Sequence, residues 1–185
     1  MPMYLEPVGD LSLLHGYKSV LIVVCPMCPA VSLAIQQRKP YMEFLRHLFG
    51  TGALKEHVAA LQDDLKRHGI RTGYFTSYFP LPLMCIWSAR QRQKLAKRAR
   101  GYEAIAVVGC DAATFNAANV VALEGCKVVQ VMHVTGIISA VPTFTRPCSL
   151  TLKTLGQKSV AWPSLPPQRA IGELRNEIVA ARDSA

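Results

Sequence analysis

Residues 19–28 have the sequence SVLIVVCPMC, an apolar, β-branched run that ends in a Cys-Pro-Met-Cys turn. A short run that is apolar at every position is typical of a strand buried on both faces, as in a parallel sheet. We therefore expect a first strand over residues 19–24, with Cys25 directly after it and Cys28 at the start of the next helix.

The rest of the chain alternates between helical and strand-like segments. Amphipathic or helix-forming stretches are expected at residues 30–37, 41–49, 54–69, 86–100 and 111–123. Further strands are expected at residues 70–76, 103–108 and 127–134. This alternation predicts a single α/β domain, a Rossmann-like or flavodoxin-like open parallel sheet of about four strands with helices on both faces.

The two ends of the chain depart from this pattern. Residues 1–17 are expected to form an N-terminal arm, residues 18–158 the α/β domain, and residues 159–185 a Pro-rich linker with a final helix. The prolines after the fourth strand predict an irregular segment there, apart from an edge strand at residues 149–153.

Composition narrows the class of protein. With 185 residues, half of them apolar, the chain can form a core without disulfide bonds. Neither a signal peptide nor a transmembrane span is predicted, so we expect a cytoplasmic protein. In a reducing compartment its six cysteines are expected to be thiols, metal ligands or redox pairs.

Four cysteines are predicted to meet at one edge of the sheet. Cys25 ends the first strand, Cys28 opens the following helix, Cys85 follows the loop after the second strand, and Cys110 ends the third strand. Because parallel strands point the same way, these residues gather at their carboxyl ends, where ligands bind in open α/β sheets. We call Cys25, Cys28, Cys85 and Cys110 the edge cysteines.

The same argument predicts the positions of the remaining cysteines and of one histidine relative to the fourth strand. Cys126 precedes the fourth strand, so it belongs at the opposite, amino edge and is expected to be a structural thiol. Cys148 and His133 follow or end the fourth strand and are possible additional metal ligands.

Four converging thiols favour a metal centre. Two thiols at Cys-x2-Cys spacing can share a metal ion, hold an iron–sulfur cluster, form a reactive disulfide, or simply pack in the core. Structural zinc sites usually carry a second close Cys-x2-Cys pair, whereas Cys85 and Cys110 are single and far apart in the sequence. We therefore prefer an iron–sulfur cluster, with zinc as the alternative.

At these motifs the chain resembles the small iron–sulfur delta subunit of methyl-viologen-reducing hydrogenases and heterodisulfide-reductase complexes. The resemblance rests on the Cys25 to Cys28 turn, on Met84 followed by Cys85, and on Gly109 followed by Cys110. It implies that the four thiols hold a [2Fe–2S] cluster that passes electrons between larger redox subunits.

A thiol–disulfide oxidoreductase is the first alternative function. Cys25 and Cys28 would then be the catalytic dithiol, on a thioredoxin-type strand, turn and helix start. Residues 140–143 resemble the cis-proline segment that faces such a dithiol, with Pro142 as the proline.

The second alternative is a module that binds an anionic ligand or an acidic partner and carries a structural zinc. It rests on a basic helix over residues 90–100 and on the formal charge of +9. The same helix is the expected contact for a larger redox protein. Nucleic acid is a less favoured partner because no recognised motif accompanies the charge, and a homodimer is the default assembly.

Overall fold

The computed structural model describes residues 3–43, 51–78, 80–122, 124–145 and 149–159. Its elements follow the order β1 (Met3–Pro7), α1 (Ser12–His15), β2 (Ser19–Val24), α2 (Cys28–Gln36), β3 (Met42–Glu43), α3 (Gly52–Arg67), β4 (Arg71–Thr76), the short 3-10 helix η1 (Met84–Ile86), α4 (Ala89–Ala99), β5 (Ala104–Val108), α5 (Asp111–Val121), β6 (Lys127–Gln130), β7 (Met132–Thr145) and β8 (Ser149–Ser159).

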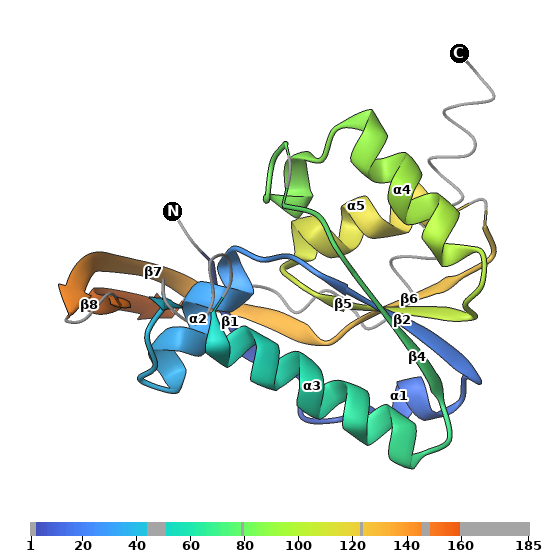
Figure 1. Ribbon diagram of the computed structural model, residues 1–185, viewed down its shortest axis with the longest axis horizontal. Helices are drawn as coiled ribbons and strands as arrows, with labels where there is room; N and C mark the ends of the chain where they lie inside the picture. The colour runs from blue at the N-terminus through green and yellow to red at the C-terminus, as the bar shows by residue number, and fades with distance from the viewer. Residues whose placement is uncertain (1–2, 44–50, 79, 123, 146–148, 160–185) are drawn as a thin grey trace.

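A four-stranded parallel sheet, which we call sheet B, forms the centre of the molecule in the order β4-β2-β5-β6. Every residue of β2 and of β5 is buried, as expected for central strands that pack against helices on both faces. Helices α4 and α5 lie on one side of this sheet, and α1 and α3 lie on the other (Figure 1). The predicted parallel sheet with flanking helices is therefore confirmed.

Helix α3 shows how the sequence sets the boundaries of these elements. The Thr51 hydroxyl accepts a hydrogen bond from the backbone N–H of Leu54 and so caps the start of the helix. After its end, Gly69 has a φ of 74°, a left-handed conformation that glycine adopts without steric cost. The helix expected within residues 54–69 is therefore present, from Gly52 to Arg67.

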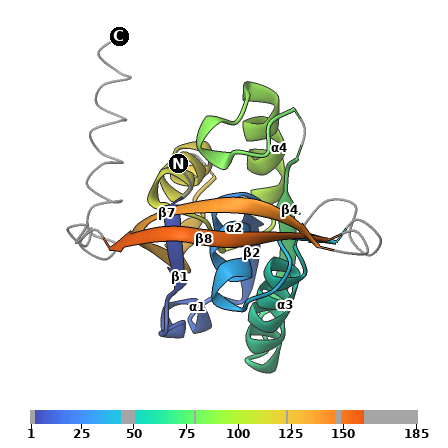
Figure 2. The same ribbon diagram turned by 90° about the vertical axis from the view of Figure 1, so that its left-hand side faces the viewer.

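A second, antiparallel sheet was not predicted. This sheet A has the order β1-β7-β8-β3, and the chain enters it directly from β6 through Val131. The fourth strand predicted at residues 127–134 is thus two strands, one in each sheet. Figure 2, which faces the side where α2 begins, shows β7 and β8 in front of that helix.

Two expectations fail because segments without a clear strand pattern find partners in sheet A. Part of the expected N-terminal arm forms β1, which pairs with β7. The edge strand expected at residues 149–153 is present as part of β8, but the segment before it, expected to be irregular, continues β7 to Thr145, and Pro142 pairs with Leu152 there. At Pro142, β8 is the neighbour of β7 among the described strands and β1 has already ended, so the missing proline N–H is tolerated.

The helix predicted at residues 41–49 is also wrong at its start, because Met42–Glu43 is strand β3, paired with β8. Residues 44–49 lie outside the described residues, as do the predicted linker and final helix of residues 160–185.

Candidate metal centre at the carboxyl edge of sheet B

The edge cysteines lie where the sequence places them, at the carboxyl ends of β2, β4 and β5. Cys25 follows β2 and Cys28 is the first residue of α2. Cys85 lies in η1, and Cys110 is the N-cap residue of α5. The chain leaves β2 toward β4 on one side and leaves β5 toward β6 on the other, so the crevice between β2 and β5 is the switch point where open α/β sheets bind ligands.

Cys25 and Cys110 are held close by the ladder between β2 and β5. The backbone N–H of Cys25 donates to the carbonyl of Val108 at 2.9 Å, which extends the parallel pairing past the end of β2. At Gly109 an added Cβ would lie 2.9 Å from Ala113 Cβ and 3.5 Å from Cys25 Cβ. Glycine at this position therefore lets α5 and Cys110 approach the end of β2.

Buried polar contacts fix the segment that carries Cys85. The Nδ2 of the buried Asn116 in α5 donates to the carbonyl of Met84, which is itself fully buried. In the preceding loop, Nε2 of buried Gln91 donates to Ser77 Oγ at 3.0 Å and to the carbonyl of Leu81 at 2.8 Å. These bonds tie the loop and η1 to the helices beside them.

The four thiols differ in exposure. Cys25 is 3% exposed and Cys110 is 8% exposed. Cys28 is half-buried and Cys85 is exposed. The group therefore runs from the end of the central strands to the surface at η1.

The pKa values show that the thiols lie within each other's electrostatic range. Burial raises the pKa of Cys25 to about 11, the N–H groups of Met84 and Met27 counteract the rise, and the neighbouring thiols of Cys28 and Cys110 add to it. Burial also raises the pKa of Cys110, opposed by the amides at the start of α5, and Cys28 and Cys85 contribute to the increase. Each of the other three cysteines thus lies near enough to Cys110 for their charges to interact.

The spacing of the sulfur atoms bears on which metal centre fits. A single tetrahedral zinc ion holds its thiolates about 3.8 Å apart, given Zn–S bonds of about 2.3 Å. Among the described residues, no three cysteines have sulfur atoms within 4.8 Å of one another. A cluster with two irons divides its four thiolates between the irons and so tolerates a wider set. The donor types fit either centre.

Tyr41 borders this site and was not among the residues found from the sequence. Its backbone N–H donates to the carbonyl of Leu150 in β8 at 2.7 Å. The pKa of its hydroxyl is raised, first by burial and then by the nearby Cys28 and Cys25. Sheet A therefore delivers a phenol next to the thiols, and only the long-range pairing with β8 puts it there.

Trp87, two residues after Cys85, is buried and packs edge-on against Phe75 with 5.7 Å between the ring centroids. Its Nε1–H has no hydrogen-bond acceptor within the described part of the chain. A buried donor without a partner costs about 1–3 kcal/mol, so this atom is an unsatisfied group close in sequence to Cys85.

The predicted structural thiol Cys126 and the additional candidate ligand His133 do not lie with the edge cysteines. Cys126 precedes β6 at the amino edge, as predicted, and its Sγ donates to the carbonyl oxygens of Tyr102 at 2.9 Å and Ala99 at 3.3 Å. His133 is exposed in β7, opposite Glu6 of β1 in sheet A. Cys148 lies outside the described residues.

Comparison with known proteins gives no further guide. No protein-family model, curated protein or solved structure matches this chain. Within the described residues, none of the helices has both the length and the apolar character needed to cross a membrane. The function must therefore be argued from the site itself.

Proposed function

We propose that the edge cysteines bind a metal centre, preferably a [2Fe–2S] cluster, and that the protein acts in electron transfer or as an accessory subunit of a redox enzyme. The observation that carries the proposal is that four cysteines lie beyond the carboxyl ends of β2, β4 and β5, by the switch point of a parallel sheet. A Rossmann-like or flavodoxin-like use of sheet B would place a ligand at this point.

Backbone N–H groups act on the buried sulfur atoms in the direction that favours thiolates, although burial raises the pKa of Cys25 and Cys110 and keeps both as thiols in the metal-free protein at neutral pH. Backbone N–H groups face Cys25 from Met84 and Met27, and the start of α5 acts on Cys110 in the same sense. Hydrogen bonds to sulfur favour its charged form, and they raise the reduction potential of a cluster. The burial of Cys25 and Cys110 is the cost that metal coordination would offset, because binding a metal displaces the thiol protons.

A bound cluster would supply one-electron transfer, and the protein supplies the route to the surface. Cys85 is exposed in η1, and the basic helix α4 begins three residues after η1 ends. Its five cationic residues and the C-cap residue Arg100 are exposed. Of these, Arg100 has an ion pair, with Glu124, among the described residues. We propose that an acidic redox partner docks on α4, close to Cys85.

The dithiol alternative fits the geometry less well. The attacking cysteine of a thiol–disulfide oxidoreductase needs a lowered pKa and access to its substrate. Here burial raises the pKa of Cys25 to about 11, and the thiol is 3% exposed. Pro142, the proline that this alternative expects to face the dithiol, is paired with Leu152 in the ladder between β7 and β8.

The test is iron and acid-labile sulfide analysis, with a visible absorption spectrum, on protein purified without oxygen. Two irons and two sulfides per chain with sulfur-to-iron charge-transfer bands are the expected result. Zinc alone would make the site structural and transfer the function to the basic surface of α4. No metal, with a reversible disulfide between Cys25 and Cys28, would establish the oxidoreductase instead.

A further inference from the structure

A second group of metal-ligating side chains lies at the opposite end of sheet B. His15 is the last residue of α1 and precedes β2, whereas Asp64 and His68 lie in and just after the last turns of α3, before β4. Both helices lead into the amino ends of their strands, so this group is at the edge remote from the edge cysteines.

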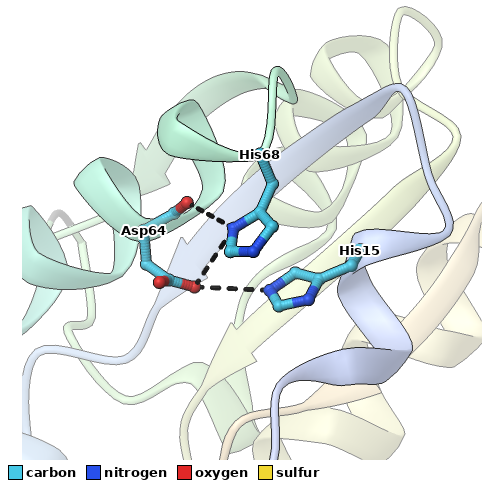
Figure 3. Close-up of side chains that lie close together, drawn as sticks. All are labelled: His15, Asp64 and His68. Carbon is cyan, nitrogen blue, oxygen red and sulfur yellow. Dashed lines mark hydrogen bonds and ion pairs between the residues drawn. The ribbon is translucent and has the colours of Figure 1, made fainter.

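The three side chains point toward one another, as Figure 3 shows. His15 Nε2 lies 3.4 Å from Asp64 Oδ2, and His68 Nδ1 lies 4.0 Å from the same oxygen. The two imidazole rings are stacked, with 3.8 Å between their centroids and 17° between their planes. One ligand atom from each residue lies within 4.8 Å of the other two, and no other group of three does so among the described residues.

The carboxylate is fixed in place before any ligand binds. Arg67 Nη2 donates to Asp64 Oδ1 at 3.3 Å, which leaves Oδ2 directed at the two histidines. The side chain of Asp64 is 29% exposed, whereas that of the adjacent Asp63 is 70% exposed. His68 Nδ1 also lies 2.9 Å from the main-chain oxygen of Asp64, so it carries the hydrogen of this bond, holds the ring against the last turn of α3 and leaves Nε2 as the nitrogen that can bind a metal ion.

We propose that His15, Asp64 and His68 bind a divalent transition-metal ion of the zinc class. Imidazole nitrogen and carboxylate oxygen are the ligands that zinc, nickel and copper ions accept, with bonds of about 2.0–2.2 Å for zinc. The rings of His15 and His68 are partly exposed, so they can turn out of their stack until their in-plane lone pairs point at one ion. Three protein ligands leave a fourth position for water or for a group from a partner.

The ion would join two segments that the chain connects only through the fold. His15 belongs to α1, which follows β1, and the other ligands belong to the longest helix of the layer beneath sheet B (Figure 1). Metal binding would therefore clamp the amino-terminal segment onto α3. Because binding is linked to folding, the bound protein resists unfolding of this segment more than the metal-free protein does.

The test is a titration with zinc(II) alone, followed by NMR of the histidine imidazole resonances. Saturable shifts of both His15 and His68 at about one equivalent are expected, with little change at the exposed His133. His68→Gln should weaken the binding seen at His15 by at least about 10-fold. The matched control His133→Gln should leave it unchanged.

Two results would overturn the proposal: imidazole resonances of His15 and His68 that do not move at millimolar zinc, or equal zinc affinity in the His68 and His133 variants. The same titration on a Cys110→Ser variant separates this site from the centre at the other edge. Its zinc shifts at His15 and His68 should match those of the wild type, whatever the fate of the edge cysteines.

Discussion

The two edges of sheet B use cysteine in opposite ways. At the amino edge, the sulfur of Cys126 donates hydrogen bonds to two main-chain carbonyl groups, a role that requires the neutral thiol. At the carboxyl edge, N–H groups act on the sulfur of Cys25 and favour its thiolate, against burial and the neighbouring thiols Cys28 and Cys110, which raise its pKa. The residue type is the same, and its position relative to the strand ends determines its chemistry.

This contrast follows from the backbone. Strand ends at the carboxyl edge lead into helix N-termini, whose N–H groups are unpaired and favour negative charge. At the amino edge the chain arrives from helix C-termini, where unpaired carbonyl groups accept hydrogen bonds from donors such as the Cys126 thiol. If the edge cysteines bind a metal centre as we propose, the edge on which a thiol lies decides whether it is a metal ligand or a structural donor.

The largest expected effect is on the pH dependence of stability. In the metal-free protein, the pKa of Cys25 is about 11 when folded, against an ordinary value of 9.0. Below pH 9 both states keep the proton and stability is complete; above it the unfolded chain loses its proton first, so the free energy of unfolding falls by about 2–3 kcal/mol by pH 11. Urea denaturation across this range should show that Cys25→Ala removes most of this fall. The opposite result would reverse the assignment of the two edges. In that case the free energy of unfolding would fall between pH 9 and pH 11 in Cys25→Ala as in the wild type, but not in Cys126→Ala.

Glycine substitutions at the two edges should also differ. In Gly109→Ala the new methyl group meets Ala113 Cβ at 2.9 Å and Val107 Cγ1 at 3.4 Å, so α5 must move away from β5. We expect a loss of about 1–3 kcal/mol in the free energy of unfolding, together with reduced metal content. Gly101→Ala, before the amino end of β5, has no atom within 4 Å of the new Cβ and is the matched control. Equal unfolding energies for the two variants would refute the close approach at Cys110.

The hydrogen bond that fixes the Cys85 segment gives a third comparison. Asn116→Ala leaves the buried carbonyl of Met84 without its donor, and should cost about 1–3 kcal/mol of stability and loosen η1. Asn119→Ala, at an exposed position of the same helix, should change stability by less than about 0.5 kcal/mol. Metal affinity and chemical denaturation of the two variants would be measured together. If metal affinity stayed at the wild-type value in Asn116→Ala, Cys85 would not depend on this anchor.

Local patterns in the sequence were sufficient to predict sheet B and the positions of the edge cysteines. The apolar run of Ser19–Val24 and the glycine after α3 act through their own backbone and burial preferences, so they are visible without the fold. Because the direction of parallel strands follows from the alternation of elements, the edge on which each cysteine lies could be derived as well.

Sheet A and the proposed site of His15, Asp64 and His68 could not be predicted from local patterns. Pairing of Met3–Pro7 with β7 joins segments far apart in the chain, and Pro142 hides the strand in which it lies. Asp64 and His68 are spaced one helical turn apart, which is a visible pattern, but the partner His15 is found only once α1 packs beside α3. Tyr41 reaches the thiols through its pairing with β8, for the same reason.

Under the proposed function, the edge of sheet B at which a cysteine lies decides whether it binds the metal centre. The direct test measures the metal bound per chain in three proteins, each purified without oxygen. The wild type and Cys126→Ser should carry the same amount of metal, whereas Cys110→Ser should lose most of it because one thiolate of the set is gone. Equal loss of metal in Cys110→Ser and Cys126→Ser would contradict the assignment of the site to the carboxyl edge.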